Sequence, residues 1–257
     1  MFALYRECTC QHWIHARRMS INRGTQEVSH RPITAETFPV PVAAEKPSPP
    51  PLPRRIQLKI KRIYLDLTGP RMERAWIRAK PLIASIEGWL TPNQEKWLFE
   101  TAHSLPDRAN IVEIGSFKGR STCCLASGCR RTRKRVFAID SFGKDGYFGH
   151  HDFLEEFSQN MKRCHLAKYV HPIAGLSSEV AKTWAKPIHM LFIDGSHEYA
   201  DVLADFEGFF PHVVTGGIVA LHDVSDHWPG PLRLWHDNVK HRLNEVGYCD
   251  SLAYGRK

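Results

Sequence analysis

Short apolar runs alternate with amphipathic stretches through the second half of the chain. Five runs predict buried strands, and they lie at Ile111–Ile114, Arg135–Asp140, Tyr169–Ile173, His189–Asp194 and Gly217–His222. Helical spacing of apolar residues predicts helices between these strands. One begins near Arg120, and the others cover Asp152–Cys164, Ser177–Trp184, Ala200–Phe210 and Leu232–Val246. This alternation predicts an α/β fold with a doubly wound, mostly parallel sheet and helices on both faces. The tail, Tyr248–Lys257, is expected to form one strand or a tight hairpin.

The N-terminal third differs from the rest in composition. Residues 1–54 are basic and rich in proline, and because such a segment cannot build a packed core we expect a largely disordered arm. Residues 55–85 form a lead-in segment, in which the alternation of apolar and basic residues over Arg55–Leu67 predicts a half-buried strand. Thr91 is a candidate N-cap for a helix that ends near Ser104. We therefore place the folded domain at residues 86–257.

Length and charge narrow the class of protein. A chain of 257 residues with 42% hydrophobic content can bury one full core. The net charge of +8 belongs to the N-terminal part, since residues 1–80 carry 15 Lys and Arg against 6 Asp and Glu, which leaves 20 against 21 for the remainder. The near-neutral folded domain gives no reason to expect a nucleic-acid partner, although residues 130–135 (RRTRKR) are locally basic. A second copy of the chain, in a homo-oligomer, is a candidate partner.

Cysteine usage and hydropathy bear on location. The seven cysteines include no C-x-x-C pair, which fits reduced thiols in a cytosol-like compartment. Apolar runs stay well short of the roughly 20 residues that a membrane span needs. We therefore expect a cytoplasmic protein with no membrane partner.

A glycine-containing turn follows the first of the predicted strands, in the stretch VEIGSFKGRST. Gly115 and Gly119 let the backbone come close to a ligand, and the following helix offers free N–H groups at its N-terminus. Glu113 can accept hydrogen bonds from a cationic or hydroxylated ligand. The spacing breaks the dinucleotide fingerprint G-x-G-x-x-G, so a pyrophosphate seat is disfavoured.

Acidic residues end four of the predicted strands: Glu113, Asp140, Asp194 and Asp223. Because ligands of parallel α/β sheets bind beyond the carboxyl ends of the strands, we expect these four side chains along one rim. Asp140 can accept both ribose hydroxyls of a nucleoside, with Ser141 and Phe142 beside the adenine. Ser177 is a candidate for a contact to the adenine edge, or else a helix cap.

Two histidines accompany the last two acids. His197 lies three residues beyond Asp194, and His222 directly precedes Asp223. An imidazole that titrates near about pH 6.5 suits general-base chemistry, whereas capping of the next helix is the alternative for His197. Residues 228–231 and the loop residues 147, 148, 150 and 151 are expected to face an acceptor substrate.

These segments together resemble class I S-adenosylmethionine-dependent methyltransferases. The stretches IEGWL, VEIGSFKGRST, IDSF, FIDGSHEYADVLADF and TGGIVALHD are similar to the subgroup that includes macrocin-type sugar O-methyltransferases and cephalosporin-biosynthesis-type enzymes. The resemblance covers about residues 86–257 and implies a Rossmann-like domain with S-adenosyl-L-methionine as cofactor. The expected cofactor site comprises Glu113, Gly115, Ser116, Gly119, Ser121, Asp140, Ser141, Phe142, Ser177 and Asp194.

The resemblance also implies a metal site. Some members of the group hold Mg²⁺ with an acid after the fourth strand and an acid pair after the fifth; by position these are Asp194, Asp223 and, replacing an acid, His222. An imidazole shifts the preference toward Mn²⁺, Fe²⁺ or Zn²⁺. A metal-free site in which His222 or His197 is the general base is the alternative, so the candidate catalytic residues are His197, His222 and Asp194.

The expected activity is O-methylation of a small-molecule hydroxyl, with or without a divalent metal. Two alternatives stay open. One is a nicotinamide-dependent oxidoreductase, against which the broken dinucleotide fingerprint counts. The other is a non-catalytic Rossmann-like scaffold whose Pro-rich arm binds partners.

Overall fold

A computed structural model describes residues 53–68, 70–143 and 152–257. The chain divides into two units, Met1–Pro50 and Pro51–Lys257, and every described residue belongs to the second. The disordered arm expected over residues 1–54 therefore lies outside the described residues, apart from its last two positions. Among the described helices, none combines the length and the apolar character that crossing a membrane requires.

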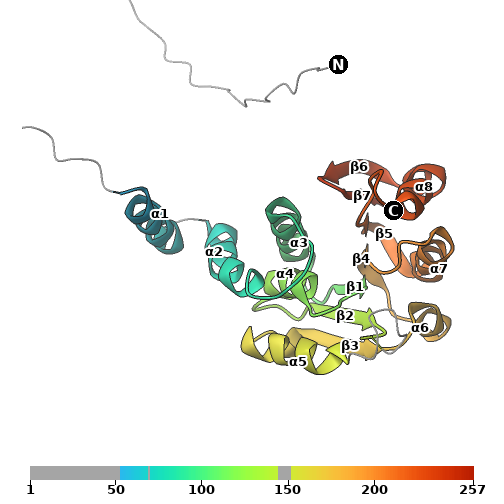
Figure 1. Ribbon diagram of the computed structural model, residues 1–257, viewed down its shortest axis with the longest axis horizontal. Coiled ribbons are helices and arrows are strands. Elements are labelled where there is room, and N and C mark those ends of the chain that lie inside the picture. Colours follow the sequence, from blue (N-terminus) through green and yellow to red (C-terminus); the bar gives the residue numbers. More distant parts are fainter. Residues whose placement is uncertain (1–52, 69, 144–151) are drawn as a thin grey trace, which may run out of the picture. The chain divides into compact units, whose positions relative to one another are not determined.

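Seven strands form one sheet in the order β3-β2-β1-β4-β5-β7-β6 (Figure 1). Their bounds are β1 (Asn110–Ile114), β2 (Arg135–Asp140), β3 (Val170–Ala174), β4 (Ile188–Ile193), β5 (Val213–Leu221), β6 (Asn244–Cys249) and β7 (Leu252–Arg256). Strands β1 to β5 pair in parallel, whereas β7 is antiparallel to both of its neighbours. The structure confirms the predicted mostly parallel α/β sheet.

Helices cover both faces of this sheet (Figure 1). They are α2 (Arg71–Ile83), α3 (Pro92–Ser104), α4 (Arg120–Gly128), α5 (Phe153–Arg163), α6 (Ser177–Thr183), α7 (Tyr199–Phe209) and α8 (Pro229–Asp237), with 3-10 turns at Ala167–Tyr169, Phe210–His212 and Val239–Arg242. Side chains of the central strands alternate between two cores; on β1, Ile111 packs with α2 to α5, and Val112 and Ile114 pack with α7 and α8. Because both faces are buried, a ligand can reach the sheet only at the strand ends.

The N-terminus of α3 is anchored to the β6–β7 hairpin. Thr91 caps the helix by accepting a hydrogen bond from the Gln94 N–H, as expected for an N-cap. The Thr91 hydroxyl donates to Asp250, and the Gln94 amide nitrogen donates to Ser251 Oγ at 3.0 Å. The capping residues therefore join two segments that lie far apart in the sequence.

The strand predicted over residues 55–67 is wrong, because these residues form helix α1 (Arg54–Thr68). Ile56, Ile60 and Ile63 are spaced by four and three residues, which fits a helix as well as the alternation fitted a strand. All three are about half exposed. A helix satisfies its own backbone hydrogen bonds, whereas a strand needs a partner edge, so the helical reading of this ambiguous pattern prevails.

The last predicted helix is too long. Helix α8 ends at Asp237, a 3-10 turn follows, and residues 244–249 form the edge strand β6. Val239 and Leu243 are buried at helix-like spacing, which produced the longer prediction. Most side chains of β6 are exposed, so this strand carries no alternation that the sequence could reveal. The tail is the hairpin that was one of the two expected arrangements.

Candidate active site

A cavity of about 660 Å³ lies at the carboxyl edge of the parallel strands. Most of the expected site residues line it: Gly115, Ser116, Ser121, Asp140, Ser141, Ser177, Asp194, His197, His222 and Asp223. They come from the end of β2, from the turns after β1, β2, β4 and β5, and from the first turns of α4 and α6. The fold thus brings together residues separated by more than 100 positions in the sequence.

Three expected cofactor residues lie behind the wall of this cavity. Glu113 is fully buried and accepts hydrogen bonds from the hydroxyls of Ser116 (3.0 Å) and Thr122. Phe142 is fully buried in the core, where its ring packs against Phe157. Gly119, the N-cap of α4, is buried and does not line the cavity either. Of the four expected strand-end acids, Glu113 therefore supports the glycine turn from beneath, and the other three face the cavity.

Burial raises the pKa of Glu113 to about 7, and hydrogen bonds from neighbouring hydroxyls only partly oppose this. A carboxyl with a higher pKa in the folded state adds stability below its unfolded pKa and loses it as the pH rises through about 7. We expect the free energy of unfolding of the wild type, relative to Glu113→Gln, to fall by up to about 3 kcal/mol between about pH 4 and pH 8. Urea unfolding at both pH values measures it. Glu100→Gln, at a partly exposed carboxylate of α3, is the matched control, and an equal pH dependence for both variants would contradict the prediction.

The glycine turn closes the corner between β1 and β4. Gly115 has a φ of +83°, and a Cβ added there would lie 2.0 Å from the carbonyl oxygen of Asp194. The N–H of Asp194 donates to Ile114 O at 2.8 Å, and the N–H of Gly115 donates to Ile139 O at 3.0 Å. Only glycine fits this close approach of two backbone segments.

Asp140 ties the turn after β1 to the turn after β2. Its Oδ2 accepts hydrogen bonds from the backbone N–H groups of Ser116 (2.6 Å) and Phe117 (2.8 Å), and its Oδ1 accepts one from Phe142 N (2.5 Å). Phe117 and Phe142 both have positive φ values, which are strained for residues with a side chain. The hydrogen bonds to the Asp140 carboxylate help to hold both residues in this conformation. Oδ2 already accepts two hydrogen bonds, so Oδ1 is the oxygen that keeps a lone pair with which it can accept a ligand hydroxyl.

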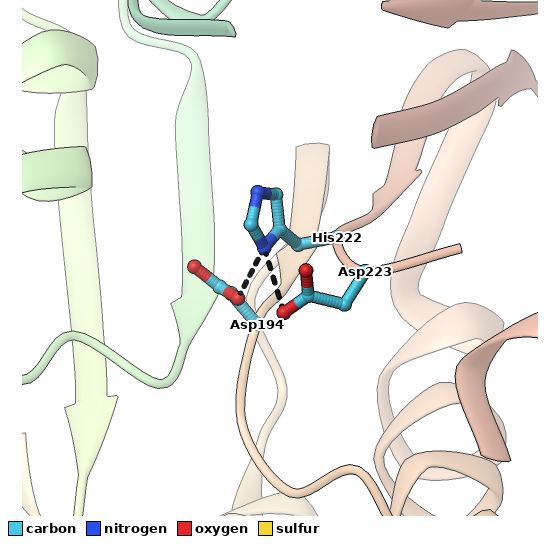
Figure 2. A group of neighbouring side chains, drawn as sticks. All are labelled: Asp194, His222 and Asp223. Carbon is cyan, nitrogen blue, oxygen red and sulfur yellow. Dashed lines mark ion pairs between the residues drawn. The ribbon is translucent and has the colours of Figure 1, made fainter. Parts of the chain in front are cut away.

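His222 lies between two carboxylates, as Figure 2 shows. Its Nδ1 is 2.9 Å from Asp194 Oδ1 and 3.1 Å from Asp223 Oδ2. Burial by itself lowers the pKa of His222, but the two carboxylates outweigh it and raise the pKa to about 10. Burial raises the pKa of Asp223, and the imidazoles of His222 and His197 bring that pKa below its usual value. The cluster is therefore held together mainly by charge.

His197 is held between a carboxylate and an indole. Its Nε2 is 3.0 Å from Asp223 Oδ2, and its ring stacks on Trp228 with centroids 3.9 Å apart. Asp223 has a φ of +56°, a strained conformation that aims its carboxylate at both imidazoles. Trp228 lines the cavity, whereas residues 229–231, also expected to face an acceptor, begin helix α8 and do not line it. Loop residues 147, 148, 150 and 151 lie outside the described residues.

The donor set fits a divalent cation. One ligand atom from each of Asp194, His222 and Asp223 lies within 4.8 Å of the others. Although Nδ1 of His222 is close to both carboxylates, it is buried and has no well-formed hydrogen bond within the described part of the chain. Two carboxylates and one imidazole suit Mg²⁺ or Mn²⁺, and the nitrogen ligand also admits Fe²⁺ or Zn²⁺.

Sequence reasoning missed several residues of the site. Trp89 and Leu90, just before α3, line the cavity, and Trp89 is 71% exposed. Asp205 of α7 also lines it and accepts a hydrogen bond from Ser177. Gln94 contacts His222, and its only signal in the sequence was its place three residues after Thr91, the spacing of a capping box. Contacts between distant segments leave no local pattern.

The strand order, with one antiparallel strand in an otherwise parallel sheet, and the glycine turn beside three strand-end acids define a Rossmann-like domain of the methyltransferase type. Residues 112–224 match the family model described as a methyltransferase domain.

Among the curated relatives that match, two cover about half of the chain. An uncharacterized protein of Sinorhizobium fredii is 31% identical over 153 residues, which are 54% of this chain and 15% of that protein. An uncharacterized protein of Acanthamoeba polyphaga mimivirus is 25% identical over 150 residues, which are 54% of this chain and 60% of that protein. The chain therefore spans less than two thirds of the length of either relative.

Solved structures share the fold. The S-adenosylhomocysteine-bound methyltransferase PaMTH1 of Podospora anserina has a TM-score of 0.56 at 16% identity, with 81% of this chain and 98% of that chain covered. An O-methyltransferase of Bacillus cereus in complex with S-adenosylhomocysteine has a TM-score of 0.53 at 18% identity, with 77% and 97% covered. These structural similarities support the fold that was assigned above from the strand order.

Proposed function

We propose that the chain transfers a methyl group from S-adenosyl-L-methionine to a hydroxyl oxygen of a small molecule. The observation that carries the proposal is that the glycine turn, Asp140 and the Asp194, His222 and Asp223 cluster all line the same cavity. Methyl transfer to oxygen needs residues that bind and align the cofactor and residues that can remove a proton from the acceptor hydroxyl. The resemblance to macrocin-type and cephalosporin-biosynthesis-type enzymes and the methyltransferase-domain match support the same activity.

The binding half of the site has two tasks. S-adenosylmethionine supplies a methyl group on a sulfonium, and its transfer is an in-line displacement that demands alignment of donor and acceptor. In the proposal, the backbone at Gly115 approaches the amino-acid part of the cofactor, and Oδ1 of Asp140 accepts a hydrogen bond from one ribose hydroxyl. Ser177, Asp205 and Leu176 are near enough in the cavity wall to border the adenine.

The chemical half must remove a proton from the acceptor hydroxyl. Because Asp223 holds Nε2 of His197, the atom of His197 that takes the proton is Nδ1. His222 is a poorer base, since its side chain is only 5% exposed and both ring nitrogens face polar atoms of the protein. A divalent cation held by Asp194, His222 and Asp223 would lower the pKa of the acceptor hydroxyl. Trp228, stacked on His197, offers the acceptor an apolar surface.

Isothermal titration calorimetry with S-adenosylhomocysteine and with NADH tests the cofactor assignment. We expect only S-adenosylhomocysteine to bind. Binding of NADH alone would support the oxidoreductase alternative, and binding of neither would support the scaffold. A mass-spectrometric search for metabolites that gain a methyl group then identifies the acceptor class.

Asp140→Ala is expected to weaken S-adenosylhomocysteine binding by about tenfold, because the ribose loses a charged acceptor and the N–H groups of Ser116 and Phe117 lose their partner. Calorimetry measures the affinity, and Asp201→Ala, which removes another carboxylate of the cavity wall, is the control. An unchanged affinity for Asp140→Ala would remove this residue from the cofactor site.

A further inference from the structure

Gln94 connects the N-terminus of α3 to the imidazole of His222. The Gln94 side chain is completely buried and His222 is 6% exposed. Gln94 Oε1 accepts a hydrogen bond from Thr91 N at 2.9 Å and lies 3.2 Å from His222 Nε2, while its amide nitrogen donates to Ser251 Oγ at 3.0 Å. Every polar atom of this amide therefore has a partner, and one of the partners belongs to the candidate active site.

These contacts fix the orientation of the amide. A backbone N–H can only donate, so the Gln94 atom that faces Thr91 N must be the oxygen. The same oxygen faces Nε2 of His222, and because an amide oxygen cannot donate, that ring nitrogen must carry a proton. The other ring nitrogen, Nδ1, is then the atom directed at the two carboxylates.

We propose that Gln94 is a positioning residue that keeps a proton on Nε2 of His222 and thereby presents Nδ1 to Asp194 and Asp223. Where the imidazole is a metal ligand, an acceptor behind the ring fixes its orientation and increases its basicity. That consequence for metal binding rests on the proposed function, in which these three side chains hold a cation. The assignment of the proton to Nε2 depends only on the contacts of Gln94.

Two substitutions at Gln94 separate this role from packing. Gln94→Met keeps the length of the side chain and removes the acceptor, whereas Gln94→Glu keeps an acceptor for both Thr91 N and His222 Nε2. We expect Gln94→Met to weaken Mn²⁺ binding by about tenfold or more and Gln94→Glu to stay within about threefold of the wild type, by calorimetry. Ser251→Ala, which removes only the partner of the amide nitrogen, is the control and is also expected to stay within about threefold. Equal losses in the Met and Glu variants would overturn the proposal.

Nuclear magnetic resonance provides a readout that needs neither metal nor activity. In protein labelled with ¹⁵N-histidine, the His222 ring is assigned by comparison with His222→Asn, and its spectrum is recorded with and without Mg²⁺. We expect the wild type to carry a proton on Nε2 in both samples. A bare Nε2 would overturn the proposal even if Gln94→Met does not fold. If Nε2 is protonated and the wild type binds no Mn²⁺, the assignment of Gln94 stands and the metal part of the proposed function fails.

Discussion

Asp223→Asn is expected to lower the turnover of methyl transfer by about 100-fold or more while leaving the affinity for S-adenosylhomocysteine largely intact. The substitution preserves the shape of the side chain and removes its charge. Both imidazoles that contact Asp223 then lose a carboxylate partner, His197 at 3.0 Å and His222 at 3.1 Å. Since Asp140 and the glycine turn belong to the carboxyl ends of β2 and β1, two or more strands away from Asp223 after β5, their contacts to the cofactor are expected to remain.

The measurement combines single-turnover kinetics, with the acceptor that the metabolite search identifies, and calorimetry with S-adenosylhomocysteine. Asp237→Asn is the matched control, because Asp237 is an exposed carboxylate that pairs with Arg233 on α8 outside the cavity. Its turnover should stay near that of the wild type. Equal losses of turnover and cofactor affinity in Asp223→Asn would mean that the acceptor side of the cavity has been misplaced.

Gly115→Ala is expected to destabilise the protein by about 3 kcal/mol or more and to reduce S-adenosylhomocysteine binding below detection. The added methyl would lie 2.0 Å from the Asp194 carbonyl oxygen, so β1 and β4 must separate at the edge where the ligand binds. Backbone cannot move aside as a flexible side chain can. The strain of φ +83° on a residue with a Cβ adds to the clash.

Gly216→Ala separates the clash from the strain. Gly216 has a similar φ of +76°, but a Cβ added there meets nothing within 4 Å. This variant should lose only about 1–2 kcal/mol and bind S-adenosylhomocysteine normally. Urea unfolding and calorimetry on both variants make the comparison, and equal behaviour would show that the close approach of Gly115 to Asp194 is not what the turn requires.

Most of the fold could be predicted because buried parallel strands leave a strong signal. Ile188–Ile193 and the second half of β5 are nearly continuous apolar runs, since helices cover both faces of the sheet. Strand β6 had no such signal, because its side chains are mostly exposed at the edge of the sheet. The apolar positions of α1 fitted two periodicities, and only the structure distinguished them.

The part of the candidate site that could be predicted consists of residues whose position relative to a strand fixes where they lie in the fold. An acid at or just beyond the carboxyl end of a buried parallel strand lies at the edge where ligands bind, and this rule located Asp140, Asp194 and Asp223. Glu113 is one residue short of the end of β1, so its side chain points into the interior beneath the turn. Gln94 and Trp89 come from a segment outside the strand–helix repeats, and no local rule connects them to His222 or the cavity.

The hairpin turn at residues 250–251 connects the candidate active site to the last two strands, β6 and β7. Ser251 contacts Gln94, and its carbonyl oxygen accepts a hydrogen bond from the N–H of Val224, directly after Asp223. During synthesis on the ribosome, β1, β2 and β4 can emerge and pair while residues 244–256 are still in the exit tunnel. Gln94 and the N–H of Val224 then lack these partners, so the imidazole cluster is the last part of the candidate site to gain its support.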